Sequence, residues 1–346
     1  MNKKTFTLVA MLLYCATMFS QNKKVKNYFD YIHQAENFIV ESNYKKALKY
    51  YKKAFKTPEI SFNLDYQNAL LCGCKLNDEE IIKKYFLILK QRNFNINKLK
   101  KYCLETISED IWNSLDKKEV TPSIDTIYEN ELKEVLKKDQ AIRIFISNAG
   151  GNYETHGDTA AYVDSLNIEY LKHLIQTKGF PTEYMVGNNY GLYLSVRHNQ
   201  QWKNKTLDKL LYKQTLLGNF SPYKYAFLYD YWTNNFERNR ETYRMENANI
   251  IGDTLYFDYW TKNEVQIDSL RKILFIESME LQRYKIASNK HKEGFRFHCT
   301  YLAYYNGIDE VTKAELINIF EDSRIKHENS KKNDTNNKRN SRKKHR

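Results

Sequence analysis

Residues 35–58 read AENFIVESNYKKALKYYKKAFKTP, and this stretch decides what the first third of the chain forms. The segment that begins 34 residues later, 69–92, reads ALLCGCKLNDEEIIKKYFLILKQR. Four residue types recur at the same places in both segments, in the pairs Ala35/Ala69, Asn43/Asn77, Lys49/Lys83 and Tyr51/Tyr85. A period of this length is typical of stacked helical hairpins. Glycine and proline are scarce up to residue 149, which also favours helices.

The first segment places small and aromatic residues where two packed helices need them. Ala35 and Ala47 let antiparallel helices approach closely, while Phe38 and Tyr51 fill the space between neighbouring pairs. This pattern resembles the tetratricopeptide repeat, closely in the first unit and more loosely in the second. The resemblance implies a short array of helical hairpins over residues 21–116 that binds a protein or peptide. Two units bury little surface alone, so we expect them to lean on the region that follows.

The first 20 residues predict a secretory signal peptide. Lys3 and Lys4 give it a positive start, and residues 6–19 form an apolar run that is short for a membrane span. Ser20 is a small residue at the end of this run, so we expect cleavage close to it. The sequence therefore predicts a secreted or periplasmic protein, with residues 1–20 removed and a mature chain that begins near Gln21.

The cysteines bear on lipid anchoring and on disulfides. Tyr14 is too large for the residue before a lipidated cysteine, which argues against a lipoprotein anchor at Cys15. Four cysteines follow the leader: Cys72, Cys74, Cys103 and Cys299. An oxidising compartment permits disulfides, but the spacing of these residues fixes no pairing. No histidine lies near Cys72 and Cys74 in the sequence, so we interpret this pair as small packed residues rather than metal ligands.

The charge of the chain is concentrated at its C-terminal end. The formal net charge is +13, and residues 325–346 carry nine basic and two acidic residues. Without this tail and the two leader lysines the body carries only +4, which excludes a broad phosphate-binding surface and specific nucleic-acid binding. The tail has no apolar periodicity and predicts a disordered segment that contacts anionic surfaces weakly. A mean hydropathy of −0.73 excludes a multi-span membrane protein.

Residues 117–324 predict a second, larger helical domain with one small β-hairpin. The expected helices span residues 130–146, 165–178, 188–199, 205–217, 222–234, 264–288 and 309–322. The hairpin is expected near residues 250–259, where a Gly-Asp pair marks the turn and Leu-Tyr-Phe favours a strand. The whole chain is thus predicted to be mainly α-helical.

Local signals set the ends of one of these helices. Asp164 or Ser165 is expected to cap the helix over residues 165–178, after a glycine-rich loop. Gly179 suits the left-handed conformation at a helix C-terminus, and Pro181 prevents the helix from continuing.

A series of polar motifs follows in a fixed order over residues 132–281. In order they are Asp139-Gln140 with Arg143, Asp164 with Asn167, Gly179-Phe180-Pro181-Thr182, Val186-Gly187, His198, Ala226-Phe227-Leu228-Tyr229-Asp230, and Asp268 with Arg271. The ordered series resembles an uncharacterised, often secreted bacterial family, domain of unknown function 6624. The family has no activity to carry over. Arg197, Tyr231 and Tyr243-Arg244 depart from its pattern, so any catalytic site of the family would be altered in this chain.

We expect the polar residues of this series to share one pocket. Its binding residues would be Asp139, Arg143, Asn167, Tyr225 and Tyr229, with His198 and Asp230 as a catalytic pair. An imidazole held by a carboxylate is a general acid/base unit. Simpler interpretations stay open: a surface ion pair for Asp139 and Arg143, a helix cap for Asp164, and internal bracing for His198 and Asp230.

Other motifs that carry chemistry are missing from the sequence. It has no glycine-rich phosphate loop, no paired-histidine zinc motif and no Gly-x-Ser-x-Gly elbow. The spacing of His291, His298 and Cys299 is not diagnostic of a metal site, so we assign no metal and no cofactor. The sequence predicts a secreted or periplasmic helical interaction protein of unknown partner. The alternative is a cell-envelope enzyme, such as a hydrolase, that uses His198 and Asp230.

Overall fold

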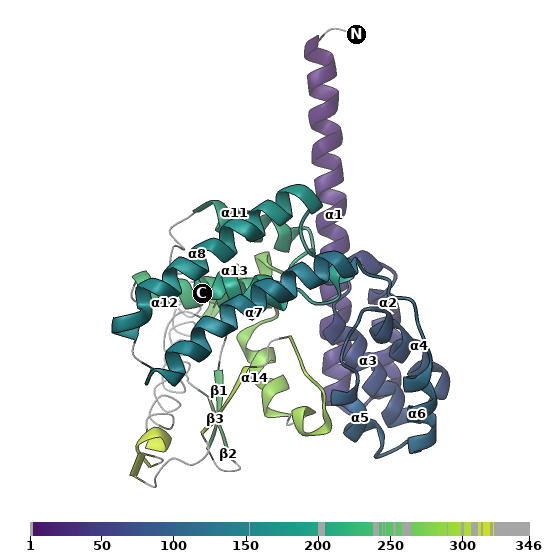
Figure 1. Ribbon diagram of the computed structural model, residues 1–346. Coiled ribbons are helices and arrows are strands. Elements are labelled where there is room, and N and C mark those ends of the chain that lie inside the picture. The colour runs from purple at the N-terminus through teal and green to yellow at the C-terminus, as the bar shows by residue number, and fades with distance from the viewer. Residues whose placement is uncertain are drawn as a thin grey trace, which may run out of the picture.

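Helices form most of the chain, which confirms the predicted mainly α class (Figure 1). The structure is a computed structural model that describes residues 3–151, 153–199, 205–237, 242–243, 245, 247–251, 254–257, 264–288, 290–298, 301–305, 311–312, 314–318 and 321. Cys299, the tail over residues 325–346 and much of the helix expected over 309–322 lie outside these ranges. No helix among the described residues is both long and apolar enough to span a membrane.

The repeat region folds into successive helical pairs. Its helices are α1 (Lys3–Val40), α2 (Tyr44–Ala54), α3 (Asn63–Leu76), α4 (Glu79–Gln91), α5 (Asn97–Cys103) and α6 (Glu109–Lys117). α1 packs on α2, α2 on α3, and α3 on both α4 and α5. The matched residues Ala35, Ala69, Tyr51 and Tyr85 are all fully buried. Two of the four matched pairs therefore mark positions of the core, whereas the matched lysines Lys49 and Lys83 are exposed.

α1 is longer than its packing partners. From Val25 onward it contributes buried residues to the core, and its N-terminal end extends away from the rest of the molecule (Figure 1). Nε2 of Gln21 donates a hydrogen bond to the carbonyl oxygen of Leu217 at 3.1 Å. The cleavage point predicted near Gln21 therefore lies between the extending part of α1 and its packed part.

The predicted second domain contributes the remaining helices. They are α7 (Thr126–Asn148), α8 (Tyr153–Lys178), α9 (Glu183–Val186), α10 (Tyr190–His198), α11 (Lys205–Leu216), α12 (Pro222–Glu237), α13 (Glu264–Ile273) and α14 (Met279–Ala287). α7 packs against α8 and α10, and α12 packs against α10 and α11. Gly179 has a φ of +87° directly after α8, as predicted for its stop.

Two helices differ from the prediction by more than a few residues at their ends. α8 begins at Tyr153, so Asp164 lies inside the helix instead of capping it. The single helix expected over residues 264–288 is divided into α13 and α14. Phe275 takes a φ of +60° at the break, and the Ser278 side chain accepts the N–H of the third residue of α14.

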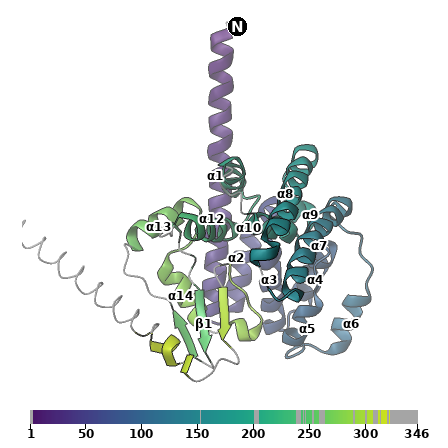
Figure 2. The same ribbon diagram turned by 60° about the vertical axis from the view of Figure 1, so that its left-hand side comes forward.

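A small sheet lies beside α14 (Figure 1, Figure 2). β1 (Asn247–Ile251) pairs antiparallel with β2 (Thr254–Phe257), which is the predicted hairpin. β3 (Tyr301–Tyr305) pairs parallel with the other edge of β1 and gives the strand order β2-β1-β3. β3 was not predicted, because a parallel partner from a distant segment has no adjoining turn to mark it.

One continuous hydrophobic core joins the two predicted domains. It includes buried residues from Val25 on α1 to Phe297 after α14, on both sides of the boundary expected at residue 116. Phe29 on α1 stacks on Phe275 with ring centroids 6.2 Å apart. The helical pairs thus pack against the rest of the chain, as expected for two units that bury little surface alone.

Candidate functional site

Three helices of the second region bring polar motifs together. α10 packs against both α7 and α8. Gly191 permits this close approach, because a Cβ atom there would overlap the carbonyl oxygen of Leu132 on α7. The last residue of α10, His198, is thereby placed against α7.

Asp139 on α7 lies at the centre of this arrangement. Its side chain is fully buried, and Nδ1 of His198 lies 2.9 Å from its Oδ1 and 3.1 Å from its Oδ2. Nε2 of Gln140 donates a further hydrogen bond to Oδ2 at 2.6 Å. A buried carboxylate needs such partners. Asp139 therefore orients the His198 ring while these contacts stabilise its own charge.

Arg143 connects this pair to α8. Its Nη2 donates to Oδ2 of Asp164 at 2.8 Å, and its Nη1 lies 3.8 Å from Oδ1 of Asp139. Burial raises the pKa of Asp164, and the Arg143 guanidinium opposes that shift. The ion pair of Asp139 and Arg143 is present, but it joins two largely buried side chains one turn apart on α7 rather than two surface side chains. We call Asp139, Gln140, Arg143, Asp164 and His198 the Asp139 cluster.

Three buried polar atoms beside the Asp139 cluster have no hydrogen-bond partner within the described part of the chain. They are Oδ1 of Asp164, Nδ2 of Asn167 and Oγ of Ser195, on residues that are 1% to 3% exposed. Asn167 follows Asp164 by one turn of α8, and Ser195 precedes His198 by one turn of α10, so each lies on the same helix face as a cluster member. Nearly all buried polar atoms in proteins are hydrogen-bonded. Ordered water or a ligand would supply the hydrogen-bond partners that these three atoms lack.

The cluster reaches solvent at one edge. The side chains of His198 and Arg143 are 23% and 18% exposed, whereas those of Asp139 and Asp164 are 0% and 3% exposed. Nδ1 of His198 is held by Asp139, and its Nε2 forms no hydrogen bond to any residue that the structure describes. A molecule from solvent can therefore meet the imidazole at Nε2.

Asp230 does not pair with His198, which corrects the expected catalytic pair. Oδ1 of Asp230 accepts the backbone N–H groups of Thr242 at 2.9 Å and Tyr243 at 3.0 Å, and Oδ2 accepts that of Met245 at 3.2 Å. Backbone N–H groups satisfy a buried carboxylate as an imidazole would. Asp230 therefore fastens the segment that follows α12.

The described contacts of Tyr225 and Tyr229 include the segment after α12 and Asp208, and none is with the Asp139 cluster. The Tyr225 hydroxyl donates to Oδ1 of Asp208 at 2.7 Å, and its ring lies 6.0 Å from that of Tyr229. The ring of Tyr229 lies 5.5 Å from that of Tyr243. Nη1 of the buried Arg271 donates to the carbonyl oxygen of Tyr243 at 3.0 Å. Asp230, Tyr229 and Arg271, which belong to the last polar motifs of the series, thus hold the segment around Tyr243 in place.

A second group of buried charges joins α1, α3 and the C-terminal segment. Nζ of Lys285 lies 2.6 Å from Oε2 of Glu36 and also contacts Glu277. Nε2 of His298 lies 2.8 Å from Oδ1 of Asp65. We call these five residues the buried ion network. Of these five, only His298 was a candidate from the sequence, although the buried Glu36 lies among the apolar residues of α1 and is a signal that the sequence contains.

Part of the buried ion network has the spacing of a metal site. Ligand atoms of Glu36, Asp65 and His298 lie within 4.8 Å of one another. Each carboxylate already has partners, however, because Lys285 binds Glu36 and the Tyr28 hydroxyl donates to Asp65. These contacts indicate a network of ion pairs rather than a metal centre.

Comparisons of the chain with protein-family models, with curated proteins and with solved structures found no match. The two family resemblances in the sequence therefore stay predictions. The function has to be argued from the geometry of the site.

Proposed function

We propose that the chain is a secreted or periplasmic helical binding protein whose ligand occupies the space beside the Asp139 cluster. One observation carries the proposal: buried polar atoms of Asp164, Asn167 and Ser195 have no partner among the residues that the structure describes. Leaving such an atom unsatisfied costs about 1–3 kcal/mol. A ligand that forms hydrogen bonds to all three would recover this free energy on binding.

The groups around this space favour a small neutral ligand that both donates and accepts hydrogen bonds. Asp164 offers an acceptor, Asn167 a donor, and Ser195 either. Arg143 faces the carboxylates of both Asp139 and Asp164, so its positive charge is already paired and does not select an anionic ligand. Hydroxyl groups meet these requirements. We infer a compound with several hydroxyl groups, such as a sugar, that enters at the exposed edge of the cluster.

Two features support the export part of the proposal. The first is the leader, in which two lysines precede a short apolar run. The second is a disulfide between Cys74 and Cys103. Structural disulfides persist in secreted and periplasmic proteins, where the surroundings are oxidising, and are rare in the reducing cytosol.

Replacing Asn167 with leucine tests the ligand site before any ligand is known. Leucine keeps the shape of the side chain and removes an unsatisfied donor. The ligand-free protein should therefore keep its stability, or gain about 1–2 kcal/mol in the free energy of unfolding. Urea denaturation measures this change.

Asn68→Leu is the matched control. Nδ2 of Asn68 donates to the carbonyl oxygen of Arg296 at 2.6 Å, and its Oδ1 accepts the Arg296 N–H at 3.1 Å. This fully bonded asparagine should cost about 1–3 kcal/mol when replaced. An equal loss in Asn167→Leu would show that Asn167 braces the fold through ordered water and would contradict the ligand site. Sugars that raise the melting temperature of the wild type should not raise that of Asn167→Leu.

An acid/base enzyme is the second candidate, and the hydrogen bond between His198 and Asp139 favours it. A carboxylate that holds Nδ1 of an imidazole fixes the tautomer and leaves Nε2 free to move a proton. The pair in this candidate is His198 with Asp139, and Asp230 no longer belongs to it.

The enzyme candidate predicts hydrolysis of at least one member of a panel of chromogenic glycosides and esters. His198→Gln should then lower kcat by about 10²–10⁴-fold, because it removes the group that transfers the proton. Asp139→Asn should cause a loss of the same order by disturbing the tautomer. Asp230→Asn serves as the control and should leave kcat unchanged. An inactive wild type, or equal kcat in wild type and His198→Gln, would contradict this candidate.

A further inference from the structure

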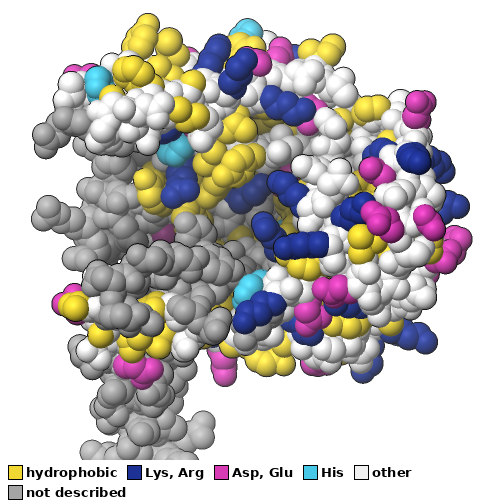
Figure 3. All heavy atoms as spheres, turned by 60° about the horizontal axis from the view of Figure 1, so that its bottom comes forward, with side chains coloured by type: hydrophobic (Ala, Val, Ile, Leu, Met, Phe, Trp, Pro, Cys, Tyr) yellow, Lys and Arg dark blue, Asp and Glu magenta, His cyan; other side chains and the backbone are white. Residues whose placement is uncertain are grey.

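A hollow lies between α5 and the segment that follows α14, with α3 behind it. It encloses about 1090 Å³, and its wall includes Gln67, Lys98, Lys101, Tyr102, Arg296 and His298. Figure 3 shows Lys and Arg side chains gathered around the hollow in the middle of the face that is turned forward. We call it the basic hollow.

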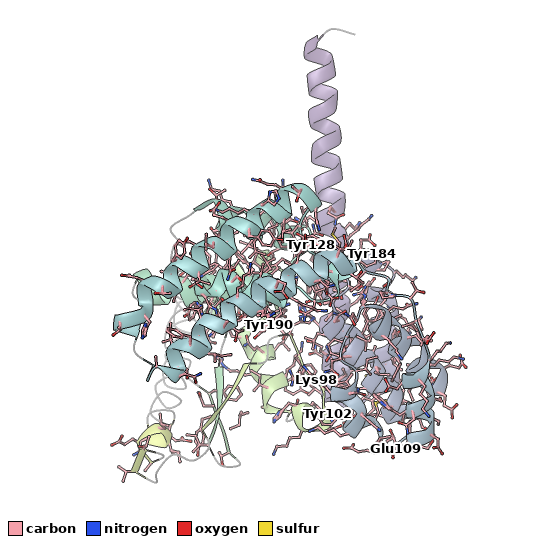
Figure 4. All side chains as sticks on the ribbon, viewed as in Figure 1. Lys98, Tyr102, Glu109, Tyr128, Tyr184 and Tyr190 are labelled. Atoms are coloured by element: carbon pink, nitrogen blue, oxygen red, sulfur yellow. A yellow bond between two sulfur atoms is a disulfide. The ribbon has the colours of Figure 1, made fainter. Side chains whose placement is uncertain are left out.

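Both walls of the basic hollow are fixed by specific contacts. Asn68 on α3 holds the backbone of Arg296 through both atoms of its amide group. Gly294, with a φ of +90°, lies so close to the Tyr102 ring that a Cβ atom there would overlap it. Figure 4 places Lys98 and Tyr102 on the side of α5 that faces this segment. The shape of the hollow is therefore fixed by hydrogen bonds and close packing within the fold.

Three cations at the rim of the basic hollow lack an acidic partner. Lys98, Lys101 and Arg296 are exposed, and within the described ranges none of them forms an ion pair. The ammonium of Lys101 lies 4.7 Å from the centroid of the Tyr102 ring. In contrast, Lys100 on the same helix binds Glu109 at 2.7 Å. Positive charge thus collects at the rim without being neutralised by the protein.

Apolar side chains form part of the wall of the basic hollow. Leu64, Phe94 and Leu99 line it from the helical side, and Phe295 and Phe297 from the C-terminal segment. Apolar wall residues beside cationic ones suit a ligand that carries both apolar and negatively charged groups.

We propose that the basic hollow binds an acidic segment of a partner protein, a role that goes beyond the ligand site at the Asp139 cluster. Its volume of about 1090 Å³ lies just above the upper end of the range of about 300–1000 Å³ that is usual for small-molecule pockets, so it has room for a short peptide in which acidic and apolar residues alternate. The tail of this chain cannot be the occupant, because residues 325–346 carry nine basic and two acidic residues. Three cations on a body of charge +4 are too few for a nucleic acid.

Fluorescence anisotropy with labelled octapeptide pools tests this proposal on the purified mature protein. In one pool, Asp and Glu alternate with mixed apolar residues, and in the second pool Asn and Gln replace the acids. The wild type should bind the acidic pool. Its affinity for the neutral pool should be lower by about tenfold or more. The triple variant Lys98→Glu/Lys101→Glu/Arg296→Glu should lower affinity for the acidic pool by about tenfold or more, because it reverses the rim charge.

Lys45→Glu/Lys49→Glu/Lys52→Glu is the matched control, since it makes the same change in net charge with exposed lysines of α2. It should leave the affinity within about twofold of the wild type, because screening weakens distant charges. Equal losses in the two triple variants, or no binding of the acidic pool by the wild type, would overturn the proposal. Anionic lipid vesicles and inorganic phosphate are the alternative probes. The proposal would also be overturned if one of these probes binds the wild type and binds the rim variant more weakly, while the affinity for the acidic pool is the same in both proteins.

Discussion

Replacing Lys285 with methionine should lower the free energy of unfolding by about 3–5 kcal/mol, because it leaves two buried carboxylates without their cation. Nζ of Lys285 lies 2.6 Å from Oε2 of Glu36 and also contacts Glu277. All three side chains are at most 1% exposed, so water cannot replace the lost ammonium group. Urea denaturation of wild type and variant measures the loss.

The destabilisation by Lys285→Met should shrink as the pH falls. Burial raises the pKa of Glu36, and Lys285 opposes this shift in the wild type. Without Lys285 the pKa of Glu36 in the folded state rises further above that in the unfolded state. The folded variant then binds a proton that the unfolded chain releases, so its stability relative to the wild type improves on acidification and falls as the pH rises.

Two further variants separate the lost charge from lost packing. Lys272→Met, at an exposed position of α13, should change the stability by less than about 0.5 kcal/mol. Adding Glu36→Gln and Glu277→Gln to Lys285→Met should restore much of the stability, since no uncompensated charge then stays buried. A loss that is independent of pH, and that the glutamines do not reduce, would contradict the role assigned to the buried ion network.

Elements whose ends depend on neighbouring residues could be predicted from the sequence. Gly179 ends α8 where its conformational freedom is needed, and β1 pairs with β2 on the two sides of the Gly-Asp pair that predicted the hairpin. The break at Phe275 was not predicted, because the apolar periodicity continues across it and hides the capping signal of Ser278. Local patterns thus give the helices but not every interruption in them.

The candidate site could be predicted only in part. The order of the polar motifs led us to expect Arg143 and His198 in one place, and the structure brings both to Asp139. The carboxylate that would hold His198 could not be predicted, because both α7 and α12 pack on α10. Periodicity shows that Asp139 and Asp230 each lie among apolar residues, but the packing of the helices decides which one meets the imidazole.

Removing the disulfide between Cys74 and Cys103 should lower the free energy of unfolding by about 3–4 kcal/mol. The bond joins the last turn of α3 to the end of α5, and the two cysteines are 29 residues apart. Opening this loop in Cys74→Ala/Cys103→Ala gives the unfolded chain more conformational entropy, which favours unfolding. Urea denaturation without a reducing agent compares the variant with the wild type.

Cys72 supplies the matched control for this prediction. It is a free, buried cysteine, and burial raises the pKa of its thiol, so it stays a packed and unreactive side chain. Cys72→Ala should cost only about 1 kcal/mol and should still respond to a reducing agent as the wild type does. The double variant should not respond, and a double variant as stable as the wild type would contradict the prediction.

Protein recovered from the envelope or the medium should carry the disulfide and begin near Gln21, whereas reduced cysteines on a chain that keeps Met1 would contradict export.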